Sequence, residues 1–171
     1  MAKRSDNARA SLDTPTYLGR APITREEAVR RTEEYFGGSP NGKIATAAWV
    51  DKYALKDADG NFYEATPDDM HHRLAKEFAR IEQKYPKPVS EEEIYGLLKD
   101  FKYIVPQGSP MAGIGNDFQV VSLANCFVIV NESDSYGVIM ITDEEQVQLM
   151  KRRGGVGHDI SHLRPYKTDI S

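Results

Sequence analysis

The spacing of apolar residues changes after Tyr103, and this change limits the fold more than any other feature of the sequence. Before it, apolar residues recur every three or four positions, as in Met70, Leu74 and Phe78, which indicates amphipathic helices. After it, Gln119–Val130 forms a run rich in Val, Ile and Phe, which is typical of a buried strand. We therefore expect a mixed α/β fold, in which a helical N-terminal region precedes the opening elements of an α/β domain.

Several helix starts are marked by a capping residue followed three positions later by glutamate. Such pairs are Thr24 with Glu27, Ser90 with Glu93, and Thr142 with Glu145. Thr66 followed by Pro67 marks another start, because proline suits the first helical position. Ile44–Leu55 fits a short helix and an extended segment equally well. Asp159–Leu163 is a candidate strand, so that strand, helix and strand follow one another as in a βαβ unit.

These patterns divide the chain into three regions. We expect a flexible polar arm over residues 1–20, a mostly helical region over 21–103, and the start of an α/β domain over 104–171. A sheet of one or two strands leaves its edges unpaired and one face uncovered. The last region is therefore expected to need a partner chain or a continuation.

The composition excludes several classes of protein. The formal net charge of −4 argues against nonspecific nucleic-acid binding, which depends on a basic surface. No apolar run reaches the roughly 18 residues that a membrane helix needs, and the polar start of the chain does not resemble a secretory signal. Cys126 is the only cysteine, so an internal disulfide is impossible. We expect a cytoplasmic protein without nucleic-acid or membrane partners.

Two glycine clusters, Gly113-x-Gly115 and Gly154-Gly155-x-Gly157, stand out in the second half of the chain. Neither is a Walker loop, since no Gly-Lys-Ser/Thr follows, and neither fits the dinucleotide fingerprint. Helix ends and tight turns explain such glycines, and so does the close approach of the backbone to a ligand. The pattern leaves both interpretations open.

The remaining candidate residues are ambiguous when each is taken alone. A single cysteine in a hydrophobic strand, such as Cys126, usually indicates inert packing. Asp134 and Ser135 are typical turn residues. The basic stretch Lys151–Arg153 either complements the dipole at a helix end or joins Arg164 in a phosphate site.

Two histidines four positions apart, His158 and His162, could share a metal ion on a helix. Their stretch looks extended, and no third ligand is evident in the sequence. We therefore expect no metal site in this chain.

Four stretches, taken together, resemble the catalytic subunits of ribonucleotide reductases. They are WVDKYALKDADGNFYEATPDDMHHRLAKEFARIE from Trp49, FKYIVPQGSPMAGIGNDFQVVSLANCFVIVN from Phe101, DSYG from Asp134, and TDEEQVQLMKRRGGVGHDISHLRP from Thr142. Their combined order and spacing is far more specific than any single glycine motif. The stretches around Asn125–Phe127 and Lys151–Asp159 are most similar to the adenosylcobalamin-dependent class.

The resemblance implies a ten-stranded α/β barrel built from two five-stranded halves, of which this chain holds the opening strands and helix. It also implies a reaction in which hydrogen replaces the ribose 2′-hydroxyl of a ribonucleotide. A thiyl radical removes the 3′-hydrogen, the 2′-hydroxyl leaves as water, and a cysteine pair supplies the reducing equivalents. By this resemblance Cys126 is the first cysteine of the pair, and Ser109, Asn125, Gly154 and Gly155 bind the substrate.

The same resemblance implies an effector site for a deoxynucleoside triphosphate or ATP. Asp134 and Ser135 match its start, and Arg164 matches a residue that holds the effector phosphate. The helix over Asp143–Arg153 is implied to lie at a dimer interface. Adenosylcobalamin, the second redox cysteine, the radical cysteine and a thioredoxin- or glutaredoxin-type reductant are implied for the complete enzyme, outside these 171 residues.

Three hypotheses follow. The chain is a reductase fragment that is inactive alone and works with the polypeptide that carries the remaining barrel. Alternatively, it is a free-standing nucleotide-binding or interaction module derived from the reductase N-terminus, or a truncated product with no role of its own. The sequence does not distinguish a diphosphate from a triphosphate substrate.

Overall fold

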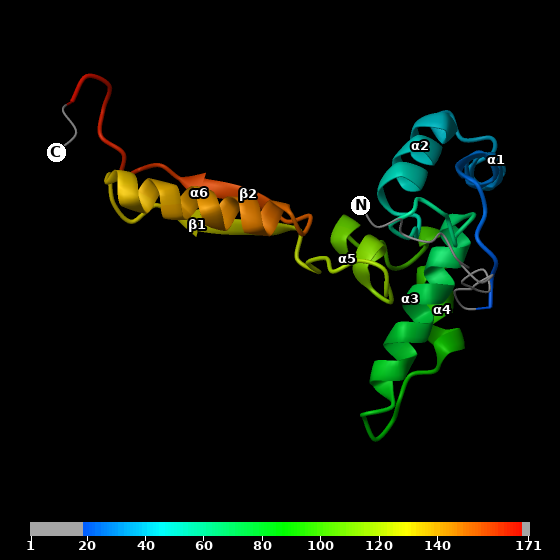
Figure 1. Cartoon of the computed structure of the whole chain (residues 1–171). Helices are drawn as coiled ribbons and strands as arrows, with labels where there is room; N and C mark the ends of the chain where they lie inside the picture. Colours follow the sequence, from blue (N-terminus) through cyan, green and yellow to red (C-terminus); the bar gives the residue numbers. More distant parts are fainter. Residues whose placement is uncertain (1–18, 169–171) are drawn as a thin grey trace, which may run out of the picture. The chain divides into compact units, whose positions relative to one another are not determined.

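The structure, a computed structural model, describes residues 19–168, which divide into two compact units after Pro67. The arm expected over residues 1–20 lies outside the described residues, apart from Gly19 and Arg20. In chain order the elements are α1 (Arg25–Tyr35), α2 (Gly42–Lys52), α3 (Pro67–Glu82), α4 (Glu91–Leu98), the 3₁₀ turn η1 (Lys99–Phe101), α5 (Gly108–Gly113), β1 (Cys126–Val130), α6 (Tyr136–Met150) and β2 (Gly155–Asp159) (Figure 1).

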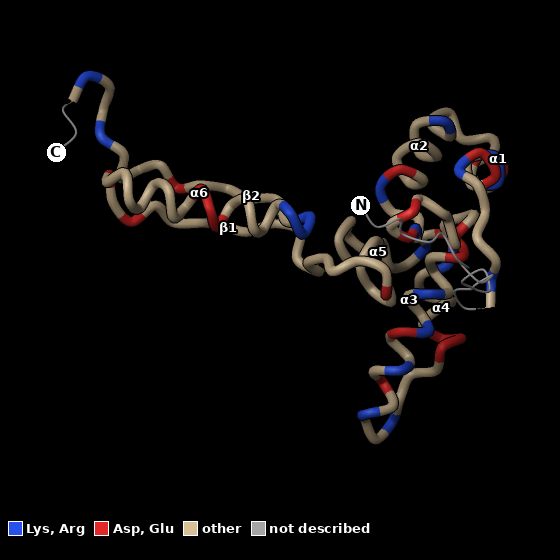
Figure 2. The backbone as a smooth tube through the Cα atoms, in the orientation of Figure 1, with Lys and Arg blue, Asp and Glu red and all other residues tan. Residues whose placement is uncertain are grey.

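Helix α1 begins where the sequence predicts, at the residue after Thr24. The Thr24 side-chain oxygen accepts the backbone N–H of Glu27 at 3.2 Å. The Glu27 carboxylate binds Arg30 and Arg31 on the next turn of the helix. Both acidic and basic residues lie on this helix (Figure 2), which fits a peripheral position in the first unit.

Helix α2 settles the ambiguous segment Ile44–Leu55, because Gly42–Lys52 is helical. Trp49 and Val50 on this helix are buried, and α1 and α2 pack against each other. A helix directs both side chains to the core of the first unit. Their burial therefore stabilises the helix relative to an extended segment.

The turn predicted over Asp57–Asn61 is confirmed. The Asp57 carboxylate accepts the backbone N–H of Asn61 at 2.9 Å, and Gly60 has a positive φ of 86°. Phe62 then forms antiparallel bridges with Lys56 and Ile23. The bridge to Lys56 makes the segment a very short hairpin that closes the first unit.

Helices α3 and α4 form the core of the second unit. Met70 on α3 is fully buried, as its helical spacing predicts. Helix α4 begins with a complete capping box between Ser90 and Glu93, which confirms the predicted start. Between the helices, the Tyr95 hydroxyl donates to Asp68 Oδ1 at 2.7 Å. Burial and this hydrogen bond raise the pKa of Tyr95 to about 12.

The segment between Tyr103 and the strand pair contains a short helix. Helix α5 spans Gly108–Gly113, and the backbone then turns through Gly115 at a φ of +68°. A methyl group on Gly113 would lie 2.5 Å from a methyl carbon of Val121. Gly113 is therefore required by side-chain packing, which favours the structural interpretation of this glycine cluster.

The buried strand predicted over Gln119–Val130 is wrong in length and in burial. Only Cys126–Val130 is a strand, and its sole partner in the described sheet is β2. Helix α6 contacts the strand, and Ile129 is buried, whereas Val128 on the opposite face is 80% exposed. An unbroken run of apolar residues is typical of a strand that is buried on both faces, but the described residues cover only one face of β1.

Helix α6 also differs from the prediction, which started it after Thr142 and ran it over Asp143–Arg153. It begins at Tyr136 and ends at Met150, with Ser135 as the N-cap that accepts the backbone N–H of Val138 at 3.3 Å. Thr142 lies inside the helix and donates its hydroxyl to the Val138 carbonyl at 3.0 Å. A threonine in a helix interior can satisfy its hydroxyl in this way, so the Thr-x-x-Glu pattern was a false start signal.

Strand β2 spans Gly155–Asp159, so it ends where the predicted strand over Asp159–Leu163 would begin. It runs parallel to β1, in a register that joins Cys126 to Gly155 and Val130 to Asp159. Helix α6 contacts both strands and lies along one face of the pair (Figure 1). The predicted βαβ order is thus confirmed, while the ten-stranded barrel remains a prediction.

No helix among residues 19–168 has the length and apolar character needed to cross a membrane.

Candidate functional site

The start of the parallel strand pair brings together the thiol and the glycines that the sequence singles out. Cys126 is the first residue of β1, and its side chain is exposed. Its register partner is Gly155, the first residue of β2. The backbone N–H of Gly155 donates to the Asn125 carbonyl at 2.7 Å. The thiol therefore stands beside an exposed glycine backbone, and it is not packed inertly in a core.

The Asn125 side chain links this strand end to helix α5. Its Oδ1 accepts the backbone N–H of Ser109 at 2.8 Å, and its Nδ2 donates to Gln107 Oε1 at 2.5 Å. Ser109 itself is buried. Both the oxygen and the nitrogen of the side-chain amide thus have hydrogen-bond partners, which fixes the orientation of Asn125 immediately before the cysteine. Ser109, Asn125, Cys126 and Gly155 form one cluster, which we call the thiol end.

Gly154 and Gly155 are required for different reasons. A methyl group on Gly154 would lie 2.7 Å from the ring carbon Cε2 of Phe127 and 3.1 Å from the Leu149 carbonyl oxygen. Gly154 is buried, so side-chain packing explains its lack of a Cβ. Gly155 is exposed, and a methyl group there would lie 3.1 Å from the Asn125 carbonyl oxygen. Gly155 is the one whose backbone remains accessible to a ligand.

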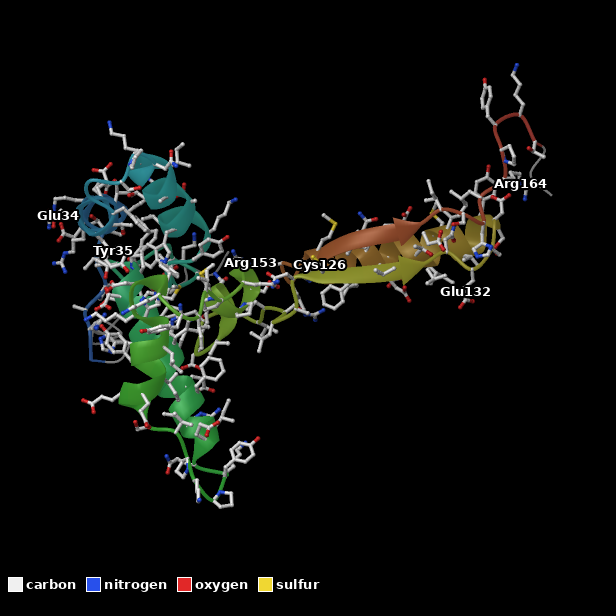
Figure 3. The ribbon with its side chains drawn as sticks, turned by 180° about the vertical axis from the view of Figure 1, so that it is seen from behind. Glu34, Tyr35, Cys126, Glu132, Arg153 and Arg164 are labelled. Carbon is white, nitrogen blue, oxygen red and sulfur yellow. The ribbon has the colours of Figure 1, made fainter. Side chains whose placement is uncertain are left out.

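A basic turn follows α6 at the same end of the strand pair. It comprises Lys151–Arg153, all exposed (Figure 2). Arg153 has a positive φ of 69°, which a non-glycine residue rarely adopts. The Arg152 carbonyl accepts the backbone N–H of Ser122 at 2.9 Å, which ties the turn to the segment before β1. Arg153 and Cys126 lie toward the same end of the pair (Figure 3). This end thus combines an exposed thiol with positive charge.

The residues predicted to bind an effector lie at the opposite end, where both parallel strands finish. Figure 3 shows Arg164 at the end remote from Cys126. The Arg164 guanidinium forms an ion pair with the Asp134 carboxylate, and both side chains are about one quarter exposed, at 24% and 21%. Ser135 follows Asp134 directly and caps α6. We call these three residues the capping end.

The ion pair changes what a ligand would meet there. In the structure Arg164 and Asp134 bind each other, and the Arg164 Nη2 also lies 3.4 Å from the Asp134 carbonyl oxygen. A phosphate bound to Arg164 would therefore compete with the Asp134 carboxylate for the guanidinium or share it. Sharing is feasible because the guanidinium has five N–H donors. The carboxyl ends of parallel strands and the N-terminus of a long helix are favourable places for a nucleotide phosphate.

Of the two histidines considered for a metal, His158 lies in extended structure as expected, whereas His162 does not. His158 is in β2, and His162 follows the strand in a turn. In the part of the chain that the structure describes, no group of three or more His, Cys, Asp or Glu side chains could hold a metal ion.

Three residues of the site region escaped the sequence reasoning. Gln107 holds the Asn125 amide, Phe127 fills the space beside Gly154, and the buried Arg73 of α3 binds the end of α5. An exposed glutamine and a strand phenylalanine carry no sequence signal of such roles. Arg73 could have been noticed, since it occupies the same helical face as the apolar Met70 and Leu74.

Residues 41–116 match the family model described as "Ribonucleotide reductase, all-alpha domain". The match covers α2 to α5 and less than half of the chain. It supports the interpretation that the helical region is part of the N-terminal portion of a ribonucleotide reductase large subunit. No curated protein matches the sequence significantly. The matched segment includes Arg73 and Ser109, whereas Cys126 and the capping end lie after it.

Proposed function

We propose that this chain is the N-terminal part of a ribonucleotide reductase catalytic subunit, in which Cys126 is the first cysteine of the reducing pair. The observation that carries the proposal is the register of the strand pair, which sets the single thiol beside Gly155. The family match of residues 41–116 supports the reductase assignment of the helical region. Activity requires the remaining barrel in addition to these 171 residues.

The thiol end is the proposed contact with the ribose. Asn125, whose amide is held by Ser109 and Gln107, orients the sugar, and the exposed backbone of Gly155 approaches it. Gly154 keeps a supporting role in substrate binding, because its packing against Phe127 fixes the position of Gly155. The basic turn after α6 supplies positive charge for the substrate phosphates.

The chemistry assigned to Cys126 is a two-electron reduction shared with a second cysteine. The ribose 2′-hydroxyl leaves as water and hydrogen takes its place, while two thiols give up two electrons and two protons and become a disulfide. The second redox cysteine and the radical cysteine belong to the remaining barrel, outside these 171 residues. A thioredoxin- or glutaredoxin-type protein then reduces the disulfide, as expected for an enzyme of the reducing cytoplasm.

Adenosylcobalamin is the proposed radical source of the complete enzyme. We assign no residue among 19–168 to this cofactor. Its role would be to generate the thiyl radical, whereas Cys126 would supply reducing equivalents after that radical has removed the 3′-hydrogen.

The capping end is the proposed site of a dNTP or ATP effector. Arg164 binds phosphate, Asp134 accepts hydrogen bonds from the sugar hydroxyl, and Ser135 positions the first turn of α6. The exposed apolar side chains on α6, namely Tyr136, Met140, Val147 and Met150, support a dimer formed through this helix. An effector bound at its N-terminus would then lie next to the partner subunit.

The experiment combines the purified chain with the polypeptide that carries the rest of the barrel and measures deoxyribonucleotide formation. ADP, CDP, ATP and CTP serve as substrates, with dithiothreitol as reductant and with or without adenosylcobalamin. We expect product only when both polypeptides are present. No product from any combination would contradict the proposal, and product without adenosylcobalamin would correct the radical source alone.

A second candidate is a free-standing nucleotide-binding module, because Asp134, Ser135 and Arg164 all lie in this chain and already form one cluster. Tight dATP or dTTP binding by the chain alone, together with no reductase activity on reconstitution, would favour this module over the enzyme.

A further inference from the structure

Arg73 on α3 is only 2% exposed, although arginine is always charged and rarely lies in a core. We propose that Arg73 is a positioning residue for the thiol end, acting through helix α5 on Ser109 and Asn125. Its significance for nucleotide binding rests on the proposed function, whereas the positioning itself does not.

The guanidinium of Arg73 binds the carboxyl end of α5. Nη2 donates to the Met111 carbonyl at 2.9 Å, and Nη1 donates to the Ile114 carbonyl. Carbonyl groups at a helix end lack partners within the helix, and a cation there also complements the helix dipole. Arg73 thus satisfies two carbonyl groups around the last turn of α5 with a single side chain.

The backbone after α5 is shaped around the same side chain. Gly115 has a φ of +68°, and a Cβ on it would lie 3.0 Å from Arg73 Cγ. The chain therefore turns closely over the aliphatic stem of Arg73. The stem and the guanidinium together define where α5 ends.

The other end of α5 meets the thiol end. The backbone N–H of Ser109, on the first turn, donates to Asn125 Oδ1 at 2.8 Å. A six-residue helix is only about 9 Å long, and Met111 follows Ser109 by two residues within it. A displacement at Met111 is therefore transmitted to Ser109, and from there to the amide beside Cys126. Arg73 is the link between the core of α3 and this site.

The test uses the full chain with Arg73→Met and Arg73→Lys, and with Arg80→Met as the matched control. Arg80 lies on the same helix and pairs with Glu77, but its side chain is 64% exposed. Nuclear magnetic resonance measures hydrogen exchange of the Ser109 amide and the chemical shifts of the Asn125 side-chain amide. The Val138 amide at the start of α6 provides an internal reference.

Arg73→Met is expected to speed exchange at Ser109 at least tenfold and to shift the Asn125 amide resonances. Arg73→Lys restores part of the protection, while Arg80→Met and the Val138 amide stay unchanged. Unchanged Ser109 and Asn125 signals in folded Arg73→Met would overturn the inference. If Arg73→Met does not fold, Arg73→Lys provides the test. We then expect hydrogen exchange at the Ser109 amide to be at least threefold faster than in the wild type. Unchanged exchange would overturn the inference.

Titration with ADP, CDP and dATP links the positioning to function. Arg73→Met should weaken ADP or CDP binding at least tenfold and leave dATP affinity within twofold. Equal ADP and CDP affinities in wild type and Arg73→Met would overturn the functional consequence. No product from any combination in the reconstitution assay, with Ser109 still loosened in Arg73→Met, would contradict the proposed function and support the positioning role.

Discussion

Cys126 and Gly155 are register partners at the start of the parallel pair β1–β2, so the single thiol of the chain lies beside an exposed glycine backbone. The residues at the far end of the same pair, Asp134 and Arg164, form an ion pair. One βαβ unit thus separates the two proposed nucleotide contacts by the length of its strands. Five residues of parallel strand correspond to about 16 Å.

The packing of Gly154 against Phe127 leads to the first prediction. Gly154→Ala should destabilise the chain by about 1–3 kcal/mol, because the new methyl group overlaps the Phe127 ring. Gly157→Ala is the matched control, since a methyl group there meets only the Phe127 carbonyl oxygen at 3.9 Å. Urea unfolding measures both variants. Phe127→Leu should recover part of the stability of Gly154→Ala, and equal destabilisation by both alanines would contradict this packing.

The ion pair of Arg164 leads to a second prediction. Arg164→Gln should weaken dATP or dTTP binding about tenfold, which corresponds to about 1.4 kcal/mol, because the variant loses the charge offered to phosphate. Arg152→Gln, at the other end of α6, should leave this affinity unchanged. Isothermal titration calorimetry on the purified chain measures both. Equal affinities for the two variants would exclude an effector site at Arg164.

The exposed apolar residues of α6 lead to a third prediction. Val147 is 61% exposed, and Val147→Glu should abolish self-association of the chain by placing a charge in the proposed dimer contact. The neighbouring exposed Gln148 provides a control, since Gln148→Glu adds the same charge outside the apolar stripe. Analytical ultracentrifugation measures both variants. A dimer that survives Val147→Glu, or a wild-type monomer at high concentration, would contradict a dimer through α6.

The fourth prediction concerns His71, which is fully buried and packs edge-on against Phe101. Burial lowers its pKa, and this effect exceeds the raising influence of Asp68 and Asp100. The unfolded chain, with an ordinary pKa near 6.5, therefore takes up a proton more readily than the folded one. The free energy of unfolding should decrease as the pH falls below this value.

Unfolding in urea at several pH values between 5 and 7.5 measures this dependence. His71→Leu should flatten the curve, because it removes the buried imidazole. A slope that persists in His71→Leu would assign the pH dependence to other groups.

Sequence reasoning worked best where a local signal and burial agree. The starts of α1, α3 and α4 follow from their caps, and the order strand, helix, strand follows from the alternation of apolar runs. Pairing in the sheet could not be predicted from one strand. The register that joins Cys126 to Gly155 depends on where β2 begins, and the sequence placed that strand four residues too late.

The errors share a physical cause. Thr142 followed by Glu145 has the pattern of a helix start, yet Ser135 caps the helix and Thr142 bonds back to Val138 inside it. The apolar run before Cys126 is not a strand. A strand forms only where a neighbouring strand offers unpaired backbone groups, and the sequence does not show where that neighbour lies. The place of Arg73 on the apolar face of α3 can be seen in the sequence, but its contact with α5 cannot, since that contact joins segments 38 residues apart.

The redox state of Cys126 after a single turnover tests the central claim most directly. The reconstituted enzyme is given ribonucleotide without external reductant, and free Cys126 is then alkylated and quantified by mass spectrometry. The account predicts one deoxyribonucleotide per site with Cys126 converted to a disulfide, and no product from Cys126→Ser despite intact dATP binding. Product formation with Cys126 still a free thiol, or full turnover by Cys126→Ser, would contradict it.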